Sequence, residues 1–269
     1  NVTNSYGDPH HVITQDEFTE KRLKQNKKAM VKTKFHRSLF PNIPDEKIEI
    51  VPNGLDVSMF ENVDVKRNPY LLVNTSSPDR SMDVLPELFK KVKDKVPQAK
   101  LFWAYGWETF DASFKNDKKM MEWRNNLQKE IDEAGIISLG KIPQAECAKL
   151  YLEGSIFAFP SEFAEIDCIS VKKAQVAGCV PITTDFGALE ESNKYGFKIH
   201  SDKTKDNWNR PYQWHFGLED EDKQKEWVDC VVNQLQNPIE EKDRVNMGKL
   251  ISDRFNWDKI SREWGNIFN

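Results

Sequence analysis

The sequence predicts an α/β protein with a Rossmann-like parallel sheet and helices on both of its faces. Two observations lead to this fold class. The chain has 269 residues, of which 38% are hydrophobic and 30% are charged, as in ordinary globular proteins. Between residues 70 and 184, short apolar segments of strand length alternate with longer amphipathic segments of helix length. Strands that alternate with helices pair in parallel through right-handed crossovers.

The expected elements follow one another in chain order. YLLVN (residues 70–74) has the composition of a buried strand, and the next helix is expected over residues 82–96, with valine and leucine on one stripe. Further strands are expected at KLFWAYG, GIISLG, SIFAFP and VPITT. Further helices are expected at residues 117–134, 144–152, 168–178, 220–235, 240–255 and 258–268. In the segment HSDKTKDNWNRPYQWHF, hydrophobic residues follow neither the period of a helix nor that of a strand, so the segment is expected to be a loop or a lid.

A punctuated segment separates the start of the chain from the alternating region. PNIPDEKIEIVPNGLD contains three prolines and an Asn-Gly pair around a single strand at residues 47–51. Another short strand is expected at residues 29–31. We therefore divide the chain into a leading segment (1–44), a connector (45–60), a Rossmann-like domain (61–255) and a C-terminal helix (256–269).

Charge and cysteine content limit the classes of function. The net charge is −4, which argues against general nucleic-acid binding, because that binding needs an excess of Lys and Arg. Residues 21–37 are basic, and two interpretations stay open: a solvated helix face with a short strand, or a patch that touches an anionic membrane or acceptor. The cysteines form no CxxC pair and no metal-ligand spacing with the histidines, so we expect a reduced, metal-free, cytoplasmic protein.

The topology indicates where a ligand would bind. In an open parallel sheet, ligands bind outside the carboxyl ends of the strands. The loops at those ends are NTSSPDRS, YGWETFD, GKIPQAE, PSEFAEIDC and TTDFGALEE. Arg80 in the first loop is placed to reach a diphosphate, although a surface arginine is the alternative. Trp103 and Trp107 are expected in the core rather than as stacking groups.

The PSEFAEIDC loop leads directly into a helix. The amides of Cys168, Ile169 and Ser170 at its start would point at an anion such as a phosphate, because the first amides of a helix have no intrahelical partner. The loop carboxylates would accept hydrogen bonds from sugar hydroxyls. The alternative is that they only complement the helix dipole. Gly187 in the next loop makes a second amide cradle possible.

The order of several segments resembles the C-terminal, donor-binding domain of GT-B glycosyltransferases, specifically of glycosyltransferase family 4. These segments are NGLD, SSPDRSMD, LGKIPQAECAKLY, SIFAFPSEFAEIDCISVKKAQVAGCVPITTD and RFNWDKISREW. The resemblance covers residues 45–268, and it implies that residues 1–44 are the trailing segment of an N-terminal, acceptor-side domain. About 150 preceding residues of such a domain are expected to be missing, or to be replaced by a domain of another chain.

The resemblance also implies roles for individual residues. The donor diphosphate would contact Thr75, Ser76 and Arg80; the family's arginine is lost at Thr75, and the charge of its lysine is kept at Arg80. Glu165 would bind hydroxyls of the transferred sugar. Lys173 stands where the family has a ribose-binding glutamate, and a lysine, which has no acceptor, cannot replace a carboxylate that accepts from two ribose hydroxyls. Lys173 would instead pair with Glu165 or reach a phosphate.

The implied function is the transfer of a sugar from a nucleotide-diphosphate-sugar donor to a glycan, a lipid or another acceptor. The transfer would proceed with retention and without a metal or other cofactor. Arg80 and Glu165 would be catalytic, because the leaving diphosphate needs charge stabilisation. The donor-binding set would be Thr75, Ser76, Arg80, Cys168, Ile169, Ser170, Lys173 and Gly187. Two alternatives remain: a catalytically impaired binding or partner subunit, and an epimerase of nucleotide sugars.

Overall fold

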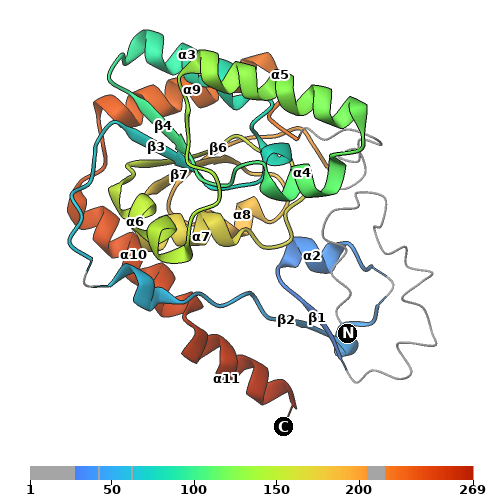
Figure 1. The fold of residues 1–269 in the computed structure, drawn as a ribbon. Coiled ribbons are helices and arrows are strands. Elements are labelled where there is room, and N and C mark those ends of the chain that lie inside the picture. The colour runs from blue at the N-terminus through green and yellow to red at the C-terminus, as the bar shows by residue number, and fades with distance from the viewer. Residues whose placement is uncertain (1–27, 42, 62, 205–215, 269) are drawn as a thin grey trace.

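A six-stranded, all-parallel sheet forms the centre of the chain in a computed structural model, which describes residues 28–41, 43–61, 63–204 and 216–268 (Figure 1). The strand order is β5-β4-β3-β6-β7-β8. The strands are β3 (Leu71–Asn74), β4 (Lys100–Trp103), β5 (Ile137–Ser138), β6 (Ile156–Phe159), β7 (Val180–Thr184) and β8 (Phe197–Ile199). The predicted α/β class with a parallel sheet is confirmed. The sequence did not predict β8, a three-residue strand that pairs with β7.

Helices cover both faces of the sheet (Figure 1). On one face lie α3 (Leu85–Lys95), α5 (Lys118–Ala134) and α9 (Glu221–Gln236). On the other face lie α6 (Gln144–Glu153), α7 (Ile169–Val176) and α10 (Glu241–Phe255). These six helices confirm the predicted ones to within a few residues. The short helix α4 (Glu108–Phe114) was not predicted, because the YGWETFD segment was interpreted as a loop.

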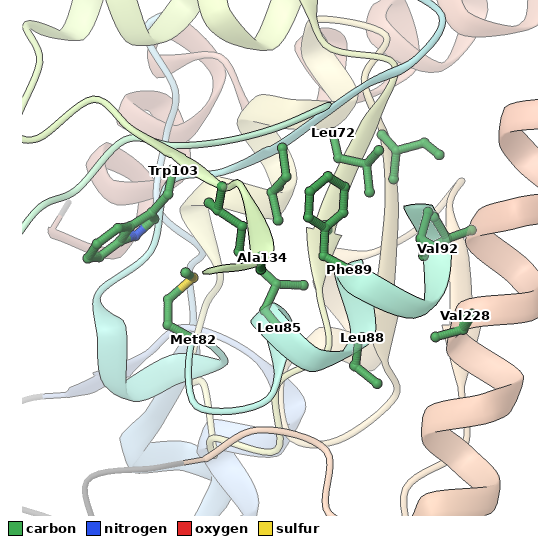
Figure 2. Packing of buried hydrophobic residues seen from close by; sticks show 14 of the residues in the cluster. Leu72, Met82, Leu85, Leu88, Phe89, Val92, Trp103, Ala134 and Val228 are labelled. Atoms are coloured by element: carbon green, nitrogen blue, oxygen red, sulfur yellow. The ribbon is translucent and has the colours of Figure 1, made fainter. Parts of the chain in front are cut away.

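Alternating side chains of the strands divide the core into two layers. In β3, Leu72 packs with the cluster that holds α3, α5 and α9, whereas Leu71 and Val73 pack with the cluster beneath α6 and α7. Figure 2 shows the first layer, where Leu72 lies near side chains of α3. Because both faces are covered, every residue of β3 is buried.

The tryptophan that ends β4 and the one that precedes α4 are core residues, as predicted. Trp103 is fully buried and Trp107 is 6% exposed. Their ring centroids lie 5.4 Å apart in an edge-to-face arrangement. The indole nitrogen of Trp103 donates to the carbonyl oxygen of Ser76 at 2.9 Å, so this side chain also fixes the loop after β3.

A small unit precedes the main sheet. It contains β1 (Ala29–Val31), α2 (Lys34–Ser38), η1 (Asp45–Lys47) and β2 (Ile48–Ile50), and it is followed by η2 (Val57–Phe60), which packs against α6 of the main domain. β1 and β2 pair in parallel as a separate two-stranded sheet. β1 belongs to the leading segment (1–44) and β2 to the connector (45–60), so this sheet joins the two. The C-terminal helix α11 (Trp257–Phe268) extends toward this unit, where the ammonium of Lys32 lies 5.1 Å from the ring centroid of Trp264 (Figure 1).

The basic stretch at residues 21–37 falls only in part within the described residues, which begin at residue 28. In that part, Lys28 pairs with Glu49 and Arg37 pairs with Asp45, each at 2.8 Å. These two positive charges are therefore partly balanced within the chain. No helix in the described part of the chain is both long and apolar enough to cross a membrane.

Candidate functional site

The loops after β3 and β6 meet at the carboxyl edge of the sheet, because these two strands are neighbours. Arg80 ends η3 (Pro78–Arg80), and its Nε lies 3.3 Å from Oε1 of Glu165. Its Nη1 donates to Oδ2 of Asp79 at 2.6 Å. The guanidinium carbon lies 3.3 Å from the ring centroid of Phe163, so the aromatic ring supports the arginine. The structure thus brings together the two residues that were expected to be catalytic.

The charges around Arg80 form a compact network. Burial raises the pKa of Glu165, and the charge of Arg80 acts against this rise. Asp79 and Asp167 add to the rise through their negative charge. Arg80 is therefore held by two carboxylates before any ligand binds. A guanidinium has five N–H donors, so those that face neither carboxylate can still bind an anion.

Gly187 brings the loop after β7 against Glu165. The glycine has a φ of +64°, and a Cβ at this position would lie 3.2 Å from both N and O of Glu165. The next amide, that of Ala188, donates to the carbonyl oxygen of Glu165 at 2.8 Å. A glycine is required here both for the left-handed backbone and for the close approach. Gly187 therefore shapes the site by fixing the backbone of Glu165.

The loop after β3 is fixed by internal hydrogen bonds. Asn74 is fully buried, donates to the carbonyl oxygen of Ala158 at 2.8 Å and accepts from the amide of Ser76 at 2.9 Å. The hydroxyl of Thr75 hydrogen-bonds to that of Tyr151 in α6. Burial raises the pKa of Tyr151 well above its ordinary value. Tyr151 has no distinguishing signal in the sequence, because a helical tyrosine next to leucines has the pattern of a core residue.

The start of α7 differs from the predicted anion cradle in one respect. The amide of Cys168 donates to Oγ of Ser192 at 3.2 Å, so the prediction that it is free for a ligand is wrong. The cause is α8 (Leu189–Ser192), which places a serine hydroxyl against the helix start. Burial raises the pKa of the Cys168 thiol well above its ordinary value, which keeps it protonated. The amides of Ile169 and Ser170 remain as candidate anion donors.

The expectation that Lys173 pairs with Glu165 is wrong. Its ammonium donates to Oε1 of Gln144, the first residue of α6, at 2.6 Å, while Glu165 pairs with Arg80. The preceding residue, Lys172, was not singled out by the sequence, yet its side chain is buried and contacts the carboxylate of Asp167. Two adjacent lysines of one helix thus have opposite surroundings.

Asp167 also connects the site to the NGLD segment. Its Oδ2 accepts from the amide of Asn53 at 2.8 Å. Gly54 lies against Trp257, because an added Cβ would come within 2.5 Å of the indole ring. The amide of Leu55 donates to the carbonyl oxygen of Phe255 at 2.7 Å. The NGLD motif is therefore the point where the leading unit, the β6 loop and the last two helices meet.

The described residues contain two histidines, His36 in α2 and His200 directly after β8, where Nδ1 of His200 lies 2.8 Å from Oδ2 of Asp185. Nδ1 of His36 accepts from the amide of Lys32 at 3.1 Å, and burial lowers the pKa of His36 to about 4. This imidazole is therefore neutral at pH 7. His10 and His11 lie outside the described residues. Within the described residues, no group of three or more His, Cys, Asp and Glu side chains is placed to hold a metal ion.

No family model and no curated protein matches the chain in sequence, but its fold matches solved structures. A variant of S. aureus TarM, in complex with fondaparinux, alpha-GlcNAc-glycerol and UDP, is 15% identical over 92% of this chain and 45% of its own, with a TM-score of 0.64. The pneumococcal O-GlcNAc transferase GtfA, in complex with UDP and GlcNAc, is 14% identical over 94% and 47%, with a TM-score of 0.66. Anabaena HepE, in complex with UDP and glucose, is 13% identical over 96% and 70%, with a TM-score of 0.67.

These similarities show that the chain has the GT-B glycosyltransferase fold, with the Rossmann-like sheet of its neighbours. The predicted resemblance in fold is therefore confirmed. The chain spans 45% of the TarM chain and 47% of the GtfA chain. What those longer proteins bind or transfer bears on this chain only as a proposal.

Proposed function

We propose that this chain is the donor-binding part of a glycosyltransferase, which transfers a sugar from a nucleotide-diphosphate-sugar to a glycan, a lipid or another acceptor. The observation that carries the proposal is the contact between Arg80 and Glu165, 3.3 Å apart, at the carboxyl edge of a GT-B sheet. At the same edge, Gly187 packs against the backbone of Glu165. The structures of TarM, GtfA and HepE, which share this fold, contain UDP, and this supports a nucleotide ligand.

In this function, Arg80 and Glu165 have different tasks. The donor diphosphate lies against the guanidinium of Arg80 and the amides of Ile169 and Ser170, while Glu165 accepts hydrogen bonds from sugar hydroxyls. When the bond between the sugar and the phosphate breaks, negative charge develops on the leaving diphosphate. A positive group that is already in place stabilises this charge without reorganisation. The reaction is proposed to retain the anomeric configuration and to use no metal.

The loop after β3 provides this positioning. Thr75 and Ser76 line the diphosphate position, and the amide of Ser76 is already held by Asn74 at 2.9 Å. Phe163 and Asp79 restrict the orientation of Arg80. A loop that is ordered before the ligand arrives lowers the entropy cost of binding.

Lys173 supports a second candidate function, a catalytically impaired subunit that binds a nucleotide sugar or a partner chain. If the resemblance places the ribose beside residue 173, a carboxylate that accepts from two hydroxyls is replaced by an ammonium, which donates to Gln144 at 2.6 Å. The two functions differ in turnover. An active enzyme releases free sugar slowly from its donor in the absence of an acceptor, whereas an impaired subunit binds the donor and leaves it intact.

The first experiment is a thermal-shift measurement with UDP-, GDP-, ADP- and TDP-sugars on the parent chain and on Arg80→Ala and Glu165→Ala. A ligand that binds only the folded state raises its unfolding temperature. We expect one nucleotide to raise the midpoint of the parent and to lose this effect with Arg80→Ala. Arg254→Ala is the matched control, because Arg254 also has a carboxylate partner and an aromatic neighbour, away from the site.

Two results would speak against the proposal. If no sugar nucleotide at millimolar concentration raises the midpoint of the parent chain, the chain does not bind a donor by itself. If a nucleotide raises the midpoint equally in the parent, Arg80→Ala and Arg254→Ala chains, it binds away from this edge. Release of free sugar, measured as donor hydrolysis by the parent chain, then distinguishes an active enzyme from an impaired subunit.

A further inference from the structure

The loops that carry Glu165 and Gly187 are also held from outside the main sheet, by residues at the start of α2. The hydroxyl of Thr33 donates to the carbonyl oxygen of Ile166 at 2.9 Å and accepts from the amide of His36 at 3.1 Å. Thr33 therefore caps α2 and binds the residue that follows Glu165. The contact spans 133 positions of the chain and joins the small β1–β2 unit to the β6 loop.

Glu191 makes the corresponding contact from the β7 loop. Its Oε1 accepts from the amide of Phe35 at 2.9 Å, and its Oε2 accepts from the amide of Lys34 at 3.0 Å. One carboxylate thus satisfies two consecutive amides at the first turn of α2. Hydrogen bonds from amides to an ionised carboxylate are stronger than neutral ones, and a helix start favours a negative charge.

Glu191 is connected to the backbone of Glu165 through α8 and one hydrogen bond. It belongs to α8, which begins directly after Ala188, and the amide of Ala188 donates to the carbonyl oxygen of Glu165 at 2.8 Å. Gly187 packs on the backbone of the same glutamate at 3.2 Å. α2 is therefore connected to Glu165 in two ways, through Ile166 and through α8.

An apolar cluster makes a parallel connection to Arg80. Phe35 of α2 packs edge-to-face on Phe186, with ring centroids 6.0 Å apart. Phe186 and Phe216 belong to the same cluster as Phe163, whose ring supports the guanidinium of Arg80. Contacts thus lead from α2 to both charged residues of the candidate donor site.

We infer that Glu191 is a positioning residue of the donor site, which ties the start of α2 to the loops that place Glu165. α2 belongs to a unit with its own two-stranded sheet, so its placement is not fixed by the main sheet itself. The order of the donor loops then depends on that unit being docked. The role assigned to Glu165 rests on the proposed function, but the mechanical connection does not.

Hydrogen exchange of backbone amides, followed by mass spectrometry, tests the connection without any ligand. Glu191→Ala is expected to raise exchange of the amides in residues 163–168 and 186–189 by about tenfold, while amides of α3 and α9 stay unchanged. Glu191→Gln keeps acceptor oxygen on the side chain and is expected to give a smaller rise. Glu190→Ala is the matched control, because Glu190 is exposed and pairs instead with Lys198 at 2.7 Å.

The result also distinguishes positioning from general stabilisation. Exchange that rises equally in all helices, or that stays the same in residues 163–168 and 186–189, would overturn the inference. If Glu191→Ala does not fold, Glu191→Gln tests Glu191 itself, and Thr33→Val tests the other contact of α2, because it exchanges the hydroxyl for a methyl group and so removes two hydrogen bonds.

Binding of UDP by calorimetric titration provides a second readout. The dissociation constant for Glu191→Ala is expected to rise about tenfold, whereas Glu190→Ala stays at the parent value. Equal affinities of the parent and Glu191→Ala would contradict the positioning role. If the parent binds no nucleotide at all, the proposed function fails, and the exchange measurement still decides the connection between α2 and the donor loops.

Discussion

The buried contact between Lys172 and Asp167 leads to a quantitative prediction. The Lys172 side chain is 2% exposed and that of Asp167 is fully buried. Burial lowers the pKa of Lys172, and the carboxylate of Asp167 raises it again. The informative variant is Asp167→Asn, because it removes the negative charge but keeps an oxygen that can accept from the amide of Asn53.

The expected loss of stability follows from the options of the unpaired lysine. At pH 7 the lysine can lose its proton, which from an ordinary pKa of 10.5 costs about 5 kcal/mol, so the cost of its unpaired charge does not exceed this value. Breaking one partner of a buried ion pair typically costs about 3–5 kcal/mol. We therefore expect Asp167→Asn to lower the free energy of unfolding by about 3–5 kcal/mol at pH 7.

Urea denaturation between pH 6 and pH 9 is the appropriate assay. In the variant, we expect Lys172 to lose its proton on folding, because burial lowers its pKa and the carboxylate that raises it is gone. The unfolded state then binds more protons, so stability rises with pH. The loss relative to the parent should shrink by up to about 1.4 kcal/mol per pH unit. Asp229→Asn is the control, because Asp229 is paired with Lys95 and Lys225 in solvent and should show a much smaller loss without this pH dependence.

Two outcomes would refute this reasoning. A loss below about 1 kcal/mol would mean that the pair contributes no more than a surface ion pair. A loss of the same size at pH 6 and pH 9 would mean that the lysine keeps its proton, and the cost would then come from packing.

Three further predictions concern single residues. Burial and the charge of Lys32 lower the pKa of His36 from 6.5 to about 4, so the free energy of unfolding falls by up to about 3 kcal/mol as the pH falls through this range. His36→Gln should abolish this loss in urea titrations at pH 7 and pH 4.5. Gly187→Ala should cost about 1–3 kcal/mol in urea denaturation, because φ is +64°. Phe163→Leu should weaken nucleotide binding by about fivefold in calorimetric titration, because Arg80 loses the ring that supports it, whereas an unchanged affinity would contradict this role.

The sequence predicts those elements of the fold that have complete local signals. The helix α5 is an example: Asp117 caps its start by accepting from two amides, and Gly135 ends it with a φ of +68°. β8 and α4 have no such signals. β8 has three residues, of which one is buried, and a period of two cannot be recognised over that length. Its formation depends on the open edge of β7, which is a tertiary contact.

The proximity of Arg80 and Glu165 was predictable from topology, because their strands are adjacent and parallel. Which of the two lysines of α7 is buried was not predictable in this way. Adjacent residues of a helix point about 100° apart, so one of Lys172 and Lys173 can face inward while the other faces outward. Which one is buried depends on how α7 packs on α10, and the ring of Phe255 in α10 lies 4.1 Å from the ammonium of Lys172. That packing angle is not visible in the local sequence.

The candidate donor site is largely saturated with internal hydrogen bonds, which bears on how it can bind a diphosphate. The amide of Ser76 is bonded to Asn74 and that of Cys168 to Ser192, and Arg80 is held by two carboxylates. Few new bonds are therefore left for a ligand to make. Under the proposed function, the affinity of the diphosphate comes from the remaining donors of Arg80 and from the amides of Ile169 and Ser170. Substitutions that relax the loop without touching these donors should then weaken binding through loss of order, and Arg80→Ala through loss of charge.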